Sequence, residues 1–225
     1  VNSIKWNISP ARIVIDSTRT YFDNILVSSS TNFIRLDGKL SRSPEEKLAL
    51  SFEGLNMSYL NNLLNKKPDK EGSPPMRFEG LMSGSVTLSD IYDNLLFESN
   101  VNVTGFRMND NDYGLVKISS VWDPRRKVAV IDVSNDFEGR KSIDIKGSYA
   151  PSTRIADIAV STLDLPLDVL NPFVSAFASD LRGVGTGKIR LKGKLKQLEM
   201  TGAVMAREAS LKISFLQTRY SFSDS

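Results

Sequence analysis

The stretch from Asp180 to Val204, DLRGVGTGKIRLKGKLKQLEMTGAV, decides the fold class of this chain. After three glycines, apolar residues alternate with lysine and arginine as far as Lys196, and Leu198, Met200 and Val204 keep one parity beyond it. A period of two sends successive side chains to opposite faces of a β-strand. The stretch therefore predicts two strands in a sheet that has one apolar face and one wet, basic face.

The composition excludes several classes of function. The chain has 225 residues, enough for one large β domain or two small ones. It contains no cysteine, which excludes disulfides and thiolate chemistry, and no histidine, which removes the commonest general base and metal ligand. The net charge of +3 is too small to indicate nucleic-acid binding. We therefore expect no enzymatic activity, no metal or other cofactor, and no nucleic-acid partner.

Targeting signals are missing from these 225 residues. The first ten residues lack the basic segment and the apolar segment of a signal peptide. No run of about 18 apolar residues, the length that crosses a bilayer, occurs in the chain. We expect any targeting segment or membrane anchor to lie outside this stretch.

Alternation marks further strands, which are separated by turns rich in proline, glycine, asparagine and aspartate. The predicted strands cover residues 3–8, 21–27, 32–40, 47–55, 77–88, 95–103, 116–121, 127–133, 142–149, 155–165 and 188–223. Residues 57–64 and 167–181 instead have the spacing of short helices, and Gly183 has the position of a helix C-terminal glycine. Residues 108–114 are predicted to form a turn and residues 66–75 an exposed, charged loop.

The chain contains an internal repeat. The matching segments are 34–40 with 143–149, 60–63 with 170–173, and 84–88 with 187–191. Each unit of about 100 residues has strands, one short helix and a strand opened by glycine, and units that cannot bury their apolar face alone stack into elongated bodies. The sequence therefore predicts one β domain of two tandem repeats, about residues 1–113 and 114–225.

Two segments carry a resemblance to a known family. Residues 187–204, GKIRLKGKLKQLEMTGAV, and the lead-in at residues 6–40 resemble the TamB and AsmA-like family of bridge-like lipid transfer proteins. That family includes the inner-membrane subunit of the bacterial translocation and assembly module. The resemblance implies a periplasmic, folded-over sheet (a β-taco) with an apolar groove, transport of phospholipid between inner and outer membrane, and assembly of outer-membrane proteins with a β-barrel partner. It implies no catalytic residues.

Parity assigns a set of apolar residues to one face of the predicted sheet, and the resemblance makes them candidates for a groove that binds acyl chains. They are Val86, Leu88, Phe97, Val101, Val103, Ile143, Ile145, Ile158, Val160, Ile189, Leu191, Leu198 and Met200. If the sheet closes on itself, this face is a core, and if the sheet stays open, the face is a lipid site. Periodicity does not distinguish the two. Two further functions stay open: a chaperone that pairs its sheet edge with outer-membrane strands, and a structural repeat with a dry core.

Other candidate sites have plainer interpretations. The glycine cluster before Lys188 fails as a phosphate loop, because Arg182 replaces a required glycine and Ile189 a required serine or threonine. The acidic run at residues 110–112 lacks the glutamate of a calcium loop, since Val121 occupies the twelfth position. We interpret it as a hairpin turn. The basic face at residues 182–196 is either the wet side of the sheet or a contact for anionic lipid heads or an acidic partner.

Overall fold

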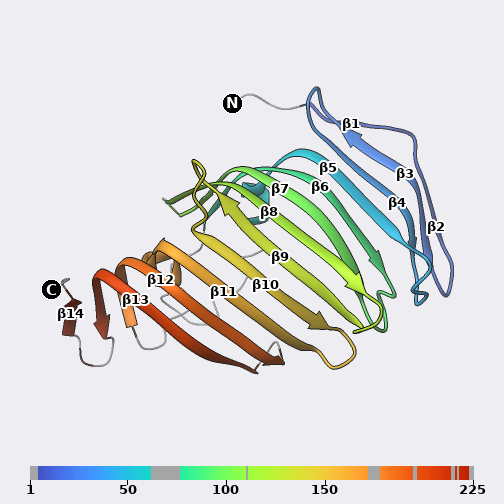
Figure 1. Cartoon of the computed structure of the whole chain (residues 1–225). Helices are drawn as coiled ribbons and strands as arrows, with labels where there is room; N and C mark the ends of the chain where they lie inside the picture. Colours follow the sequence, from blue (N-terminus) through green and yellow to red (C-terminus); the bar gives the residue numbers. More distant parts are fainter. Residues whose placement is uncertain are drawn as a thin grey trace.

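The computed structural model describes residues 5–61, 77–109, 111–171, 178–194, 197–213, 216 and 218–222. Within them the chain forms a single antiparallel sheet, which bows along its strands and does not close into a barrel (Figure 1). The strands are β1 (Asn7–Ile8), β2 (Arg12–Ile15), β3 (Thr20–Ser28), β4 (Phe33–Leu40), β5 (Leu48–Asn56), β6 (Phe78–Ser89), β7 (Leu96–Met108), β8 (Asn111–Asp123), β9 (Val128–Asp136), β10 (Ile143–Ala150), β11 (Ile155–Pro166), β12 (Ala178–Lys194), β13 (Gln197–Ile213) and β14 (Thr218–Phe222). The prediction of a mainly β, open antiparallel sheet is confirmed.

Strand order follows the sequence. From β3 to β14 each strand pairs with the strands before and after it, and β1 and β2 both pair with β3. Two short 3₁₀-helices, η1 (Met57–Leu60) and η2 (Leu167–Leu170), follow β5 and β11 and so lie at the same rim of the sheet, which we call the helix rim. The opposite turn rim carries the turns at residues 90–95, 124–127 and 151–154.

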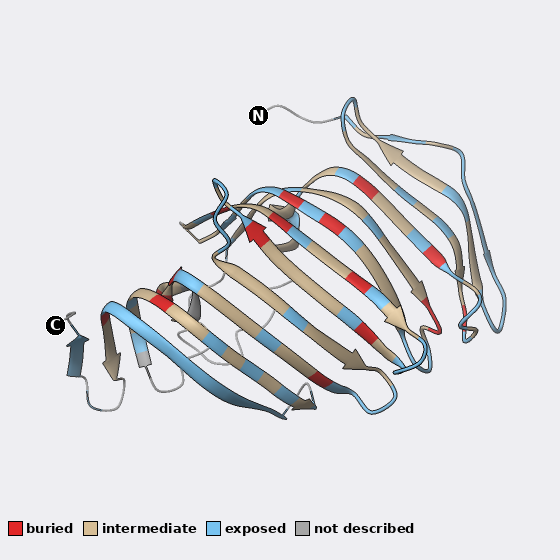
Figure 2. Ribbon diagram, in the orientation of Figure 1, coloured by how far each residue is buried: buried red, intermediate tan, exposed pale blue. Residues whose placement is uncertain are grey.

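The two faces of the sheet differ as the alternation predicts. Along β12, Lys188, Arg190 and Lys192 are exposed, whereas Ile189 and Leu191 between them are partly buried. We call the face of Ile189 the inner face and that of Arg190 the outer face. The inner face of the middle strands carries a core of Phe52, Val101, Val103, Tyr113, Val116 and Leu165. Figure 2 shows this concentration of buried positions, and it shows β13 exposed over most of its length.

The predicted helix over 167–181 is wrong at its C-terminal end, because Ala178 to Leu181 belong to strand β12. The 3₁₀-helix η2 ends at Leu170, and Ala178 already pairs with Ile213 of β13. Register shifts on either side of Arg182 interrupt the regular pairing of β12 with β13 in this part of the strand. Gly183 lies inside the strand with φ +101° and does not end a helix. Residues 172–177 lie outside the described residues.

The helix rim also differs from the prediction at the turn between β7 and β8. The turn predicted for residues 108–114 is much tighter, because β7 runs to Met108 and β8 begins at Asn111. Gly114 therefore lies within β8, where its N–H donates to the Asp112 carboxylate. The predicted helix at 57–64 is represented by η1, while its last residues and the predicted loop at 66–75 lie outside the described residues.

Equivalent asparagines hold the strand that follows each 3₁₀-helix. The Asn61 amide donates to the Phe78 carbonyl at 3.0 Å and accepts from the Phe78 N–H at 2.9 Å. The Asn171 amide does the same with Leu181, at 3.1 and 2.8 Å. These two asparagines occupy the same place in the aligned segments 60–63 and 170–173. At both places the asparagine side chain donates one hydrogen bond and accepts one, as the backbone of a paired strand residue would. The two aligned segments therefore share this contact.

Glycines that open the aligned strands also share one geometry. Gly84 lies opposite Val101, and a Cβ added to it would lie 2.1 Å from the carbonyl oxygen of Asn100. Gly187 lies opposite Val204, and its added Cβ would lie 2.2 Å from the carbonyl oxygen of Ala203. Such distances exclude any side chain unless the strands separate. The glycines therefore set a close approach between neighbouring strands at equivalent points of the two repeats.

Candidate functional site

The register of the sheet gathers the predicted site residues on the inner face, because directly opposite residues share a face. One row of opposed residues crosses the sheet from β3 to β13 and contains only aliphatic residues, one phenylalanine and two glycines. The row is Val27, Ile34, Phe52, Gly84, Val101, Ile118, Val133, Ile145, Val160, Ile189 and Gly202. An unbroken apolar row therefore runs across the strands.

A second row lies beside the first and is interrupted by polar residues. It contains Leu36, Leu50, Val86, Ser99, Ser120, Ile131, Gly147, Ile158, Leu191 and Met200. The hydroxyls of Ser99 and Ser120 lie 3.0 Å apart, so the two serines satisfy each other in the middle of the apolar face. The remaining predicted residues share the face by parity, and Leu88 lies opposite Phe97.

Part of the predicted site is a packed core within this chain. Val103 is 1% exposed and Val101 is 8% exposed, and both contact the core cluster. Val86 and Ile143 are partly buried against the same cluster. These four residues are therefore held by the protein's own side chains, and a ligand would have to displace that packing to reach the two valines.

The inner face opens toward the C-terminal strands. Beyond the core cluster the apolar row continues through side chains that are only partly buried, and Met200 at the end of the second row is 68% exposed. We call this part the open inner surface. It consists of Ile145, Ile158, Val160, Ile189, Leu191, Leu198 and Met200. Apolar side chains that stay exposed on an ordered sheet form a surface that can bind an apolar partner.

The outer face of the same strands carries ion pairs. Arg190 contacts Asp157 on the neighbouring strand through two hydrogen bonds of 2.7 and 2.6 Å. The hydrogen bond from Arg190 lowers the pKa of Asp157 below its usual range. On the strands beside them, Lys146 pairs with Asp132 at 3.0 Å. Exposed pairs of this kind contribute less than about 1 kcal/mol, and they match the wet-side interpretation of the basic face.

A polar contact joins η2 to the start of β8 at the helix rim. The Asn111 amide donates to both carboxylate oxygens of Asp168, at 3.2 and 3.0 Å. Nearby, Tyr113 is 1% exposed and its ring lies 5.9 Å from that of Phe106. Its hydroxyl has no hydrogen-bond partner among the described residues, and burial, with the Asp168 charge as a lesser cause, raises the pKa of Tyr113. The Tyr113 ring therefore stabilises the core while its hydroxyl does not.

Tyr113→Phe should leave the protein as stable as before or slightly more stable, because it removes a buried hydroxyl that makes no hydrogen bond to any described residue. Tyr113→Ala should lower the free energy of unfolding by about 3–5 kcal/mol, since it also removes the ring and leaves a cavity. Urea unfolding followed by circular dichroism measures both. A loss above about 2 kcal/mol for the phenylalanine variant would mean that the hydroxyl is hydrogen-bonded in solution.

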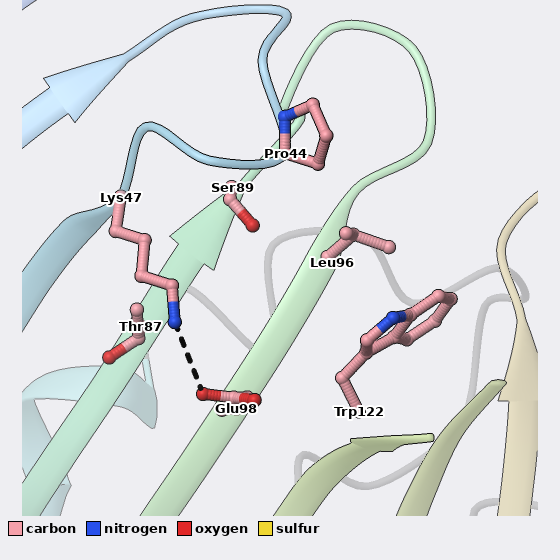
Figure 3. Close-up of a pocket in the computed structure, with 7 residues that line it drawn as sticks. All are labelled: Pro44, Lys47, Thr87, Ser89, Leu96, Glu98 and Trp122. Carbon is pink, nitrogen blue, oxygen red and sulfur yellow. Dashed lines mark ion pairs between the residues drawn. The ribbon is translucent and has the colours of Figure 1, made fainter. Parts of the chain in front are cut away.

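Sequence reasoning missed a cavity at the turn rim. It has a volume of about 300 Å³ and lies between the turns that follow β6, β8 and β10, with Leu96 and Trp122 in its wall. Figure 3 shows a smaller cavity of about 80 Å³ that Leu96 and Trp122 also line, together with the Lys47–Glu98 ion pair of 3.9 Å. The sequence signal for this cavity is Trp122 near the end of β8, and a single tryptophan near a strand end does not predict a cavity.

Comparisons with protein-family models, with curated proteins and with solved structures find no match for this chain. No helix within the described part of the chain is long and apolar enough to cross a membrane. Because no similar protein suggests a function, the function has to be inferred from the two faces and the two rims of the sheet.

Proposed function

We propose that the open inner surface binds the acyl chains of phospholipids, and that the chain is a periplasmic segment of a TamB-like protein that moves phospholipids between the inner and outer membrane of a Gram-negative bacterium. The observation that carries the proposal is the apolar row that crosses the sheet from Val27 to Ile189. It leaves the packed core at β10 and continues through partly exposed Ile145, Val160 and Ile189.

The energetics of an open surface suit transport. Burial of one CH₂ group contributes about 0.8 kcal/mol, so a chain of about 16 carbons gains on the order of 12 kcal/mol. A closed pocket with that affinity would release its ligand very slowly. A row of equivalent aliphatic contacts lets an acyl chain move from one strand to the next without returning to water. The buried core around Val103 limits such movement to the part of the face beyond it.

Photo-crosslinking in cells that carry the full-length protein tests the proposal. A photoreactive residue at Ile189 should capture phospholipid, because this side chain belongs to the open inner surface. The matched control is Lys188, the preceding residue, which is exposed on the outer face. Val101 is unsuitable, since its burial would direct the reaction to neighbouring protein. Equal lipid capture at the two positions, or capture of protein alone at Ile189, would contradict acyl-chain binding.

A second candidate function is pairing with strands of outer-membrane proteins. Strand β14 pairs only with Ala209–Ile213, so β13 from residue 197 to 208 has one partner strand, β12, among the described residues. Unpaired N–H and C=O groups on an edge can accept an added strand. Under this function the crosslinker at Ile189 would capture β-barrel peptide and not lipid. A β-barrel partner subunit would be the natural neighbour of such an edge.

A further inference from the structure

A third row of opposed residues crosses the inner face between the open inner surface and the turn rim. It consists of Trp122, Ala129, Tyr149, Ala156, Gly193 and Leu198. Ala129 is 0% exposed and Ala156 is 1% exposed, and each lies directly opposite an aromatic residue of the row. Tryptophan and tyrosine combine an apolar ring with a polar N–H or O–H, so they favour the boundary between an apolar surface and water. We call this row the aromatic row.

Basic side chains follow the aromatic row at the ends of the same strands. The hairpins β8–β9, β10–β11 and β12–β13 lie side by side (Figure 1). Lys127 and Arg154 each precede a buried alanine of the row by two residues, and Lys194 follows Gly193. We call Lys127, Arg154 and Lys194 the rim cations. All three are exposed, and none forms an ion pair with any described residue.

The acidic residues of the nearby turns are engaged or buried. Asp123 accepts hydrogen bonds from two backbone N–H groups of its own turn, at 3.0 and 3.1 Å. In the neighbouring turn at residues 90–95, Asp93 accepts from Arg42 at 2.6 Å and Asp90 is only 7% exposed. These carboxylates therefore leave the rim cations without a counter-charge.

The helix rim of the same strands has a different charge arrangement. Arg182 contacts Asp180 there at 2.7 Å, and Arg207 forms an ion pair with Asp164. Lys141 is an exception, because it has no ion pair with any described residue. Cations at the helix rim are thus mostly neutralised by neighbours, whereas the rim cations remain available to an external anion.

The order of groups along a strand matches the order of groups in a phospholipid. Along β12 the inner face has Ile189 and Leu191, then the aromatic row at Gly193, and the strand ends at the cationic Lys194. Ile189 is five residues from Lys194, which is about 17 Å along a strand. A phospholipid has acyl chains, then glycerol esters, then a phosphate. An acidic protein or a nucleic acid would match the cations but would leave the adjoining apolar surface unused.

We propose that the rim cations bind the phosphate of a phospholipid whose acyl chains lie along the strands on the open inner surface. The head group then lies at the turn rim, and it passes to the next hairpin, about 10 Å away, as the lipid crosses the strands. A head group with a net negative charge, such as phosphatidylglycerol, fits better than one with an ammonium, which the same cations repel. The inference rests on the acyl-chain binding proposed above and adds the orientation and the head-group class of the lipid.

Binding of single lipids to the purified protein tests this orientation. The chain has two tryptophans, so the Trp6→Phe variant retains only Trp122, and its fluorescence reports on the aromatic row. The probes are lysophosphatidylglycerol, lysophosphatidylcholine and monolauroylglycerol, all with a lauroyl chain and below their micelle concentrations. Lysophosphatidylglycerol should bind at least about tenfold more tightly than the other two. Raising the salt concentration from about 0.05 to 0.5 M should remove most of this difference, because it screens exposed charges.

Replacement of the rim cations isolates their contribution. The triple variant Lys127→Gln, Arg154→Gln and Lys194→Gln should weaken lysophosphatidylglycerol about tenfold and leave monolauroylglycerol unchanged. The matched control removes the same charge at three exposed lysines outside the turn rim, which also form no ion pair with any described residue, and should bind as the parent does. It consists of Lys117→Gln, Lys141→Gln and Lys188→Gln.

Each other outcome overturns the inference in a distinguishable way. If monolauroylglycerol binds but the rim variant keeps its full affinity for lysophosphatidylglycerol, the head-group site is wrong and acyl-chain binding stands. Equal weakening by the rim variant and the control would assign the effect to net charge. If none of the three probes binds, acyl-chain binding itself fails. If the rim variant loses affinity for polyaspartate and not for lysophosphatidylglycerol, the rim cations bind an acidic protein instead.

Discussion

Val103→Arg is expected to lower the free energy of unfolding by more than about 4 kcal/mol, a large part of the roughly 5–15 kcal/mol that stabilises a typical domain. Val103 is 1% exposed and packs in the core cluster with Tyr113 and Val116. A guanidinium there would lose its water without gaining a carboxylate, because the cluster around it is apolar. Urea unfolding followed by far-UV circular dichroism measures the loss.

Met200→Arg is the matched control for this substitution. It makes the same chemical change on the same face, but at a side chain that is 68% exposed, and should cost less than about 1 kcal/mol. Similar losses at both positions would mean that the inner face is sealed along its whole length, which would leave no open inner surface for a lipid. A harmless Val103→Arg would mean that the middle of the face has no packed core.

Gly84→Ala is expected to lower the free energy of unfolding by about 3 kcal/mol, because the new methyl group meets backbone. Its carbon would lie 2.1 Å from the Asn100 carbonyl oxygen and 2.8 Å from the Val101 Cα, and Gly84 also has φ +150°. The strands could accept it only by separating next to the core. Gly187→Ala, at the equivalent point of the second repeat, should behave similarly. Thermal and urea unfolding report both losses.

Gly139→Ala separates the steric cost from the conformational one. Gly139 has φ +76°, and a Cβ built on it would have no atom within 4 Å. Its substitution should therefore cost only the strain of a left-handed backbone, about 1–2 kcal/mol. If Gly84→Ala and Gly139→Ala were equally damaging, the close approach of β6 to β7 would not be the reason that position 84 is a glycine.

The sequence was sufficient to predict the two faces of the sheet. A period of two depends only on where successive side chains point, so Ile189 and Arg190 could be assigned to opposite faces without a structure. The alignment of residues 60–63 with 170–173 was also visible in the sequence, and Asn61 and Asn171 in these segments make equivalent hydrogen bonds. The alternation of apolar and polar residues could not predict how much of the apolar face is buried by other side chains of the same chain. That depends on packing between distant residues such as Tyr113 and Leu165.

The main error along the chain concerns the start of β12. The spacing of apolar residues over 167–181 was interpreted as a helix, whereas the structure places Ala178 to Leu181 in β12, where register shifts on either side of Arg182 interrupt the period of two. The cavity at the turn rim was beyond sequence reasoning for a different reason. Asp90, Trp122 and Pro151 come from three separate hairpins, and only the lateral pairing of β6 through β11 brings them to one place on the rim.

The sequential order of the strands has a consequence for how such a chain can change its length. An even number of strands, β6 to β11, separates η1 from η2, and this places both helices at the same rim. Insertion or loss of a hairpin would lengthen or shorten the sheet by two strands and would leave every later turn on its own side. Insertion of a single strand would move every later turn and 3₁₀-helix to the opposite rim. Growth in pairs is thus the only kind of extension that keeps helix-bearing and turn-bearing sides distinct.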